Sequence, residues 1–141
     1  MIDIDTLKWE LMSDEGSVKR QNRHMVYKDH LGNDTIGYGR LLSRGLSDAE
    51  AEFMLAVDIQ DTLDVLDRNI PWWRGLPSLT MRGVANLGFQ IGWSRLKGFK
   101  KTLAFLEAGL LEEASVEALD SDWARQTPER AKRVAAMLKG K

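Results

Sequence analysis

The chain has 141 residues, of which 43% are hydrophobic and 29% are charged, a composition typical of a globular protein with one domain or two small lobes. It contains no cysteine and only two histidines, which excludes a disulfide framework and a thiol nucleophile. We therefore expect neither a metal site nor a cofactor. No apolar run approaches the roughly 18 residues of a membrane helix, so we expect no membrane span.

Charge is unevenly distributed along the chain, although the net charge is only −1. The first five residues lack the basic and then apolar pattern of a signal peptide, so we expect the protein to be kept in the cytoplasm. Basic residues gather in 95–101, with four bases and no acid, and in 123–141, with six bases and one acid. These clusters suit a polyanionic partner, but a solvated basic face is the alternative. Because no recognition-helix signature is present, we expect no nucleic-acid partner.

The first predicted element is a helix that ends at an acidic residue. Apolar residues at helical spacing predict a helix over Asp5–Ser13, capped by Asp5 or Thr6 and stopped by Gly16. Glu15 then lies in the last turn, where the helix dipole disfavours an ionised carboxylate.

A short hairpin is predicted after a polar, basic loop over 17–23. Its strands are 25–27 and 35–38, and they are joined by the turn 30–33, whose Gly and Asn tolerate positive φ. Asp29 lies at this turn. The hairpin is the only β-rich stretch, which makes the two acids that flank it candidates for function.

The rest of the chain is predicted to be helical, which gives an α+β fold that is mostly α. Ser47 and Glu50 form a capping box that begins a long helix ending near Arg68; at about 30 Å it is long enough to connect two lobes. Trp72 and Trp73 follow, and their burial is favoured over stacking on sugar rings. Further helices are expected over Ser78–Ile91, Leu96–Ala108, Leu110–Leu119, around Trp123, and from Thr127-Pro128 to Lys139.

The acids of the hairpin suit hydrolysis of a glycosidic bond. This reaction requires a protonated acid for the leaving oxygen and an ionised carboxylate as base or nucleophile. Glu15 suits the acid and Asp29 the ionised partner, while Thr35 could hold a water. Adjacent strand residues point to opposite faces, so Asp34 competes with Thr35 for that role. On spacing alone, Glu15 as a solvated residue and Asp29 as a turn former remain the favoured interpretation.

Three blocks of the sequence resemble the phage-type lysozymes, or endolysins. The first block is Glu15-Gly16, then Tyr27, Asp29, Gly32, Thr35, Ile36, Gly37 and Gly39. The second is Asn86-Leu87-Gly88-Phe89-Gln90-Ile91-Gly92, then Gly98-Phe99. The third is Trp123, then Gln126-Thr127-Pro128-Glu129-Arg130-Ala131-Lys132-Arg133-Val134. The blocks occur in the family's order and together cover nearly the whole chain.

The resemblance implies a lysozyme-like fold in a single domain, 1–141. Its parts are a hairpin-bearing N-terminal lobe at about 14–46, a connecting helix at about 47–68, and a helical C-terminal lobe at about 69–141, on which helix 4–14 packs. The cleft between the lobes is expected to cleave the β-1,4 bond between N-acetylmuramic acid and N-acetylglucosamine. The activity implied is therefore that of a lysozyme, an N-acetylmuramidase.

The resemblance also assigns roles to individual residues. Glu15 matches the general acid, and Asp29 and Thr35 match the pair that positions the attacking water, which implies inversion. Arg130 matches an arginine that approaches the catalytic glutamate. Substrate-binding positions are expected at Tyr38, Phe89, Gln90 and Thr102.

Two departures from the family pattern stand out. Glu15 and Asp29 are fourteen positions apart instead of nine, and the excess lies near Lys19 to His24. Two interpretations stay open for it: its bases bind anionic groups of the cell wall, or it only extends a loop. Arg40 replaces the family's usual histidine, and we expect it to form a salt bridge with Asp58 on the long helix.

The implied biological role is host-cell lysis with release of phage progeny. We expect bacterial peptidoglycan as the partner and a monomer that depends on a holin to pass from the host cytoplasm to the wall. The alternative is a catalytically inactive lysozyme-like module that binds the wall.

Overall fold

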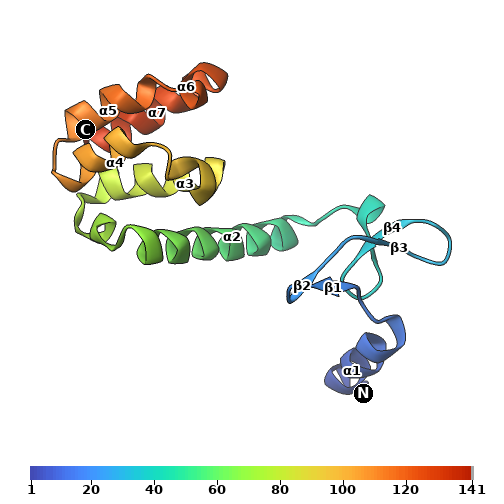
Figure 1. Cartoon of the computed structure of the whole chain (residues 1–141). Coiled ribbons are helices and arrows are strands. Elements are labelled where there is room, and N and C mark those ends of the chain that lie inside the picture. Colours follow the sequence, from blue (N-terminus) through green and yellow to red (C-terminus); the bar gives the residue numbers. More distant parts are fainter. Residues whose placement is uncertain (141) are drawn as a thin grey trace. The chain divides into compact units, whose positions relative to one another are not determined.

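The computed structural model describes residues 1–140, and the chain divides into two compact units, Met1–Ala51 and Glu52–Lys141. Most of the described chain is helical, and two small antiparallel sheets lie in the first unit (Figure 1). This confirms the α+β, mostly helical fold class. The predicted single domain and the packing of helix 4–14 on the helical lobe stay predictions. Among residues 1–140, no helix combines the length and the apolar character that crossing a bilayer requires.

The first unit begins with α1 (Ile4–Glu15), which matches the predicted helix. Its cap is Asp3 rather than Asp5 or Thr6, because the Asp3 carboxylate accepts the N–H of Thr6 at 3.1 Å. Gly16 ends the helix with φ at +61°. Its N–H donates to the carbonyl of Met12 at 3.1 Å, so Glu15 occupies the last helical position as predicted.

The segment predicted as a loop over 17–23 is instead a two-stranded hairpin, so that prediction is wrong. Its strands are β1 (Lys19–Arg20) and β2 (Arg23–His24), paired antiparallel around Gln21 and Asn22. Both turn residues have positive φ, +53° and +62°, as a two-residue type I′ turn requires. Two-residue strands are too short to show alternation, and the usual Asn-Gly or Asp-Gly signal is missing.

The predicted hairpin is present, with shorter strands than expected, and carries a third strand. The sheet consists of β3 (Tyr27–Lys28), β4 (Asp34–Ile36) and β5 (Arg40–Leu41), in that order and all antiparallel. Thr35 lies in the central strand, opposite Tyr27 and Leu41. The third strand escaped prediction because two glycines interrupt the run before it. A short 3-10 helix, η1 (Leu42–Arg44), follows.

The long helix is α2 (Asp48–Asn69), within a residue of its predicted bounds. Its capping box is confirmed: the N–H of Glu50 donates to the Ser47 hydroxyl at 3.2 Å, and the N–H of Ser47 donates to the Glu50 carboxylate at 2.9 Å. The first turn of α2 belongs to the first unit and the rest to the second.

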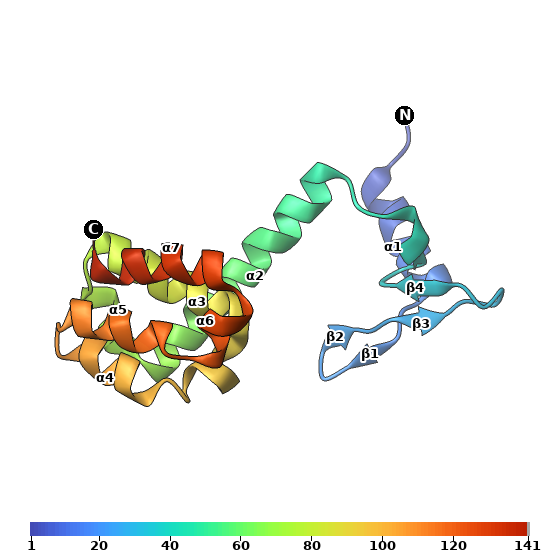
Figure 2. The same ribbon diagram turned by 90° about the horizontal axis from the view of Figure 1, so that it is seen from above.

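The second unit is a bundle of helices. Helix α7 (Pro128–Lys139) packs against α3 (Ser78–Leu96) and α5 (Leu111–Leu119), and α4 (Lys100–Glu107) packs against α5 (Figures 1 and 2). Gly92, the predicted end of a helix, has φ +76° and kinks α3, but the chain returns to helix as far as Leu96. The helix predicted from Leu96 begins only at Lys100. The elements are η2 (Pro71–Gly75), α3 (Ser78–Leu96), α4 (Lys100–Glu107), α5 (Leu111–Leu119), α6 (Asp122–Gln126) and α7 (Pro128–Lys139).

Tryptophans form the centre of the bundle's core. Burial was predicted for Trp72 and Trp73; Trp73 is 2% exposed, which confirms it, whereas Trp72 is only partly buried. The indole N–H of Trp73 donates to Asp67 at 2.8 Å. Trp123 is buried as well, edge-on to Phe99. All the buried hydrophobic side chains that the structure describes lie in this unit. The bundle is therefore held by apolar burial.

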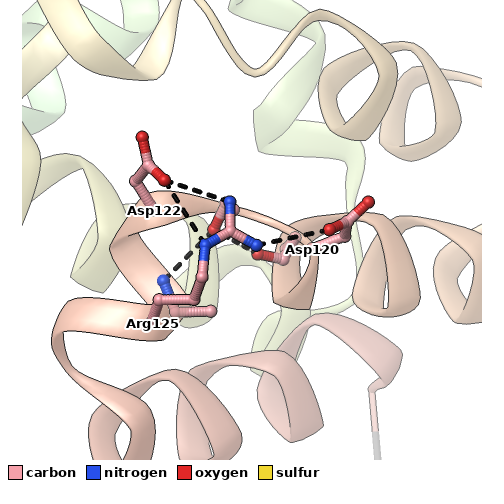
Figure 3. A network of polar contacts seen from close by, with 6 residues as sticks. Asp120, Asp122 and Arg125 are labelled. Carbon is pink, nitrogen blue, oxygen red and sulfur yellow. Dashed lines mark hydrogen bonds and ion pairs between the residues drawn. The ribbon is translucent and has the colours of Figure 1, made fainter.

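The start of α6 is fixed by polar contacts on the surface (Figure 3). The hydroxyl of Ser121 accepts the N–H of Ala124 at 3.2 Å, as a helix cap does. The guanidinium of Arg125 contacts Asp120 at 3.4 Å and Asp122 at 3.0 Å. This network orders the turn that carries Asp120 and Ser121.

Candidate active site

The predicted acid, Glu15, lies against a glycine of the three-stranded sheet. A Cβ atom at Gly39 would lie 2.7 Å from Oε2 and 2.9 Å from Cδ of Glu15. Such distances are too short for any side chain, and Gly39 also has φ +78°. The backbone conformation favours glycine, and any side chain here would displace the carboxylate end of Glu15. This contact joins the end of α1 to the chain between β4 and β5.

Asp29 is held in the turn between β3 and β4. Its Oδ1 accepts the backbone N–H of Leu31 at 2.9 Å and that of Asn33 at 2.8 Å, and its Oδ2 accepts the Asn33 side-chain amide at 3.3 Å. These bonds make Asp29 the turn former that its position predicted. A carboxylate can accept about four hydrogen bonds, so Oδ2 keeps a lone pair for another donor.

The same bonds keep Asp29 ionised. The backbone N–H of Asn33 is the largest cause that lowers the pKa of the Asp29 carboxyl below its ordinary value of 3.8. The N–H of Leu31, the Asn33 amide and the charge of His30 act in the same direction, against partial burial. Asp29 is therefore suited, as an ionised carboxylate, to orient a water, and not to donate a proton.

Asn33 connects Asp29 to Thr35. Its carbonyl accepts the N–H of Asp29 at 3.0 Å and the hydroxyl of Thr35 at 2.9 Å. Thr35 is 1% exposed, and its proton is committed to this carbonyl. The hydroxyl oxygen can therefore act only as an acceptor for a further partner. Sequence analysis treated Asn33 as a turn residue, and only the structure shows that it bridges the two predicted site residues.

The competition between Asp34 and Thr35 has a clear structural outcome within the sheet. Asp34 lies on the exposed side and pairs with Lys28, directly opposite on β3, at 2.6 Å. Thr35 points to the buried side, as the alternation along a strand requires. Asp34 therefore has a cross-strand ion pair of its own, and Thr35 is the residue linked to Asp29.

Tyr38 follows β4 and contacts the hairpin of β1 and β2, Lys19–His24, which we call the inserted hairpin because it contains the extra residues between Glu15 and Asp29. Its ring lies edge-on to His24, with centroids 5.2 Å apart and planes at 67°. His24 Nδ1 is hydrogen-bonded to the hydroxyl of Ser17 at 2.6 Å. Tyr38 is 40% exposed, so part of its ring stays available for a ligand. Its predicted role in substrate binding is neither confirmed nor contradicted by these contacts.

Arg40 has a different ion-pair partner from the predicted Asp58. Both terminal guanidinium nitrogens bind the Glu50 carboxylate, and Nη2 also donates to the carbonyl of Gly45 at 2.8 Å. Asp58 belongs to the second unit, so its pairing with Arg40 stays a prediction. Glu50 lies close to Arg40 because the capping box fixes it in the first turn of α2. Asp58 lies two turns further along the helix. The Arg40 guanidinium, first among the causes, lowers the pKa of Glu50 to about 2.

Gln90, in the second unit, is oriented by its neighbours in the core. Its Oε1 accepts the indole N–H of Trp123 at 2.8 Å, and its Nε2 lies 3.4 Å from the hydroxyl of Thr127. Thr127 in turn donates to the carbonyl of Trp123 at 2.9 Å, and this replaces its predicted role as a side-chain cap. Gln90 is therefore held in one orientation by residues of the third sequence block.

Phe89 and Arg130 line the same groove of the second unit. The groove is about 470 Å³ in volume, lies along α2, α3 and α7, and is mostly apolar. Arg130 donates from Nε and Nη2 to the Asn86 side chain, at 3.1 and 3.0 Å. Phe89 is 40% exposed, so its ring face is free to meet an apolar ligand surface. The predicted approach of Arg130 to Glu15 stays a prediction.

Thr102 lines a second cavity, of about 330 Å³, at the start of α4. The residue is 2% exposed, and its hydroxyl makes no hydrogen bond within residues 1–140. Two bases of the cluster 95–101 line the same cavity, together with three polar or acidic residues that no sequence pattern marks: Lys100, Lys101, Glu117, Asp120 and Ser121. No motif marks these residues, because they meet only when α4, α5 and α6 are packed.

Comparison with known proteins gives a consistent picture at the level of the whole chain. No family model matches the sequence. The chain is 28% identical to Probable T4-type lysozyme 2 of Dictyostelium discoideum, over 165 aligned positions that include 96% of this chain and 94% of the relative. Probable T4-type lysozyme 1 of the same organism is 24% identical with the same coverage. The chain is similar to T4-type lysozymes from end to end.

The similarity to T4-type lysozymes covers 96% of the chain and so extends over both units. It supports the lysozyme part of the predicted resemblance. Neither relative's name mentions a phage, so the phage origin and the role in host lysis stay predictions.

Proposed function

We propose that the protein is a peptidoglycan hydrolase that cleaves the β-1,4 bond between N-acetylmuramic acid and N-acetylglucosamine. The observation that carries this proposal is the seat of Glu15 on Gly39, in the same unit as the ionised Asp29. Two carboxylates in different surroundings are what this hydrolysis requires. The similarity to T4-type lysozymes supports the same activity.

In the proposed mechanism Glu15 donates its proton to the oxygen of the leaving sugar as the glycosidic bond breaks. A water attacks the anomeric carbon from the opposite face and gives its proton to Asp29, so the configuration at that carbon inverts. The free lone pair of Asp29 Oδ2 can hold one hydrogen of this water, and the Thr35 oxygen, an acceptor only, can hold the other. Since Thr35 is nearly inaccessible, we expect the water to enter beside Asp29.

The proposed substrate contacts of the second unit divide into two kinds. The exposed ring of Phe89 suits the apolar face of a sugar, and the oriented amide of Gln90 suits a polar group of the substrate. The free hydroxyl of Thr102 and the polar groups around it suit the hydroxyl and acetamido groups. Tyr38 is the proposed contact from the first unit, and Arg130 and Asp58 are proposed as supporting residues. The Arg40–Glu50 pair supports the sheet by tying it to α2.

The proposed biological role is lysis of a bacterial host by a monomeric enzyme that reaches the wall from the cytoplasm through a holin-dependent opening. This part rests on the sequence motifs alone. The competing function is a catalytically inactive module of the same fold that binds the wall. The contact of Glu15 with Gly39 favours the enzyme, because a binding module has no need to hold Glu15 against the backbone.

Mass analysis of digested peptidoglycan tests the proposal. We expect fragments whose new reducing end is N-acetylmuramic acid, and none with the variant Glu15→Gln. Reducing ends on N-acetylglucosamine would change the bond that is assigned. Binding to the wall without any fragments would favour the inactive module.

A further inference from the structure

The inserted hairpin, Lys19–His24, is anchored at its base to the sheet beside Glu15. The N–H of Met25 donates to the carbonyl of Val18 at 2.8 Å, just below the strands. His24 is hydrogen-bonded to Ser17 at 2.6 Å and lies edge-on to Tyr38. Ser17 is two residues from Glu15, and Tyr38 precedes the glycine on which Glu15 rests. The hairpin therefore contacts the segment that carries Gly39 through the rings of His24 and Tyr38.

The tip of this basic hairpin places two arginines directly opposite each other. Arg20 pairs with Arg23 across the two-residue turn, so their side chains leave the same face of the hairpin. Like charges in such a pair repel and destabilise the hairpin. His24, paired with Lys19, leaves the other face, by which the hairpin contacts Tyr38. The face that carries Arg20 and Arg23 is therefore the one that does not contact Tyr38.

No acid of the described chain neutralises this face. Among residues 1–140, Lys19, Arg20 and Arg23 have no ion pair or side-chain hydrogen bond, and all three are exposed. The other bases of the sheet differ: Lys28 pairs with Asp34, and Arg40 pairs with Glu50. A repulsive pair without an internal counter-charge points to an external anion.

We propose that Arg20 and Arg23 bind carboxylate groups of the peptide stems that the glycan strand carries, and thereby position the strand beside Glu15. This inference rests on the proposed function. The guanidinium fork matches a carboxylate with two parallel hydrogen bonds, and two facing arginines offer two such forks. A stem is attached to every N-acetylmuramic acid, so its carboxylates lie next to any bond that is cut. Phosphate polymers of the wall have no such fixed place on the strand.

The test compares glycan strands with and without stems. The substrates are peptidoglycan freed of phosphate polymers by acid, and the same material after an amidase has removed the stems. The double variant Arg20→Gln/Arg23→Gln is expected to lose about three- to tenfold in kcat/KM on the stem-bearing substrate at low salt. On stem-free strands it should equal the wild type. High salt should remove the difference by screening the exposed charges.

Two further variants control for charge and geometry. Lys8→Gln/Arg44→Gln removes the same charge from exposed positions of the first unit and should leave both rates unchanged. Arg20→Lys/Arg23→Lys keeps the charge but loses the fork, and should retain only part of the stem-dependent rate.

Each contrary result would overturn a different part of the proposal. An equal loss on both substrates, or no loss on either, would overturn the role of the hairpin while leaving the hydrolase intact. Untreated peptidoglycan, which retains its phosphate polymers, is the third substrate. A loss that appears only on this substrate would make phosphate the ligand and overturn the assignment to stems. A wild type that cuts none of the three substrates would instead refute the proposed function, and this inference with it.

Discussion

Different interactions stabilise the interior of each of the two units. The second unit buries tryptophan, leucine, valine and alanine side chains in one core, whereas Thr35 is the only buried residue that the structure describes in the first unit. The first unit relies on turns, caps and ion pairs instead, such as the bonds of Asp29 and the Arg40–Glu50 pair. We infer that the bundle's core supplies most of the folding free energy, whereas individual polar contacts set the positions of the site residues in the first unit.

The largest effect on stability is expected in the bundle, from Trp73→Ala. Loss of this buried ring should lower the free energy of unfolding by about 3–5 kcal/mol. Trp73→Phe keeps most of the packing and loses only the bond to Asp67, so its effect should be smaller. Denaturant unfolding measures both. Equal effects of the two variants would mean that the polar bond, and not the burial, stabilises this unit.

Gly39→Ala is expected to break the site with little effect on the bundle. The added Cβ must displace the Glu15 carboxylate, and a misplacement of about 1 Å can reduce a rate about 100-fold. The matched control is Gly37→Ala, because Gly37 has a similar φ of +64° and open space around the new Cβ. Both variants carry a backbone cost of roughly 1–2 kcal/mol. Activity lost to the same extent in both would show that strain, and not contact with Glu15, is the cause.

Acid should weaken the first unit through Glu50. Its pKa in the folded protein is about 2, below the ordinary 4.5, so the ionised form stabilises the fold above pH 4.5. This stability is lost as the pH falls from about 4.5 through about 2. Glu50→Gln keeps the capping geometry but has no charge, so its stability should lack this part of the pH dependence. A local probe, such as hydrogen exchange in β5 and η1, can measure it. Identical pH profiles in the two proteins would contradict the Arg40–Glu50 pair.

The smallest expected effect is a gain, at the tip of the inserted hairpin. Gln21 and Asn22 both have positive φ, which Asn-Gly adopts more readily. The variant Gln21→Asn/Asn22→Gly should raise the free energy of unfolding by about 0.5–1 kcal/mol. It should also protect the amides of this hairpin from exchange. A loss of stability would argue against the type I′ turn.

The difference between the helical second unit and the first unit, with its short strands, also explains how much of the fold could be predicted. The helices follow from periodic apolar residues and caps, and α2 was predicted to within a residue because Ser47 and Glu50 mark its start. The bundle's kink at Gly92 was predicted as an end, since a glycine signals a break but not whether the helix resumes. The inserted hairpin was missed because no pattern of hydrophobicity marks two-residue strands.

The candidate site was predictable where chemistry and motif coincide. Glu15, Asp29 and Thr35 followed from the sequence, and the structure adds the bonds that prepare Asp29 and Thr35. The contact of Glu15 with Gly39, the bridge formed by Asn33 and the choice of Glu50 for Arg40 could not be predicted. Each depends on a distance between segments, whereas spacing along the chain records only their order.

The most direct measurement of the central claim is the initial rate at which new reducing ends appear from purified peptidoglycan, for the wild type and Glu15→Gln. Glutamine has nearly the shape of glutamate and cannot donate the required proton, so we expect the rate to fall by about 100-fold or more. Unfolding should be unchanged, because Glu15 is exposed and contributes to no core. A Glu15→Gln protein that retains the wild-type rate would contradict the assignment of Glu15 as the acid.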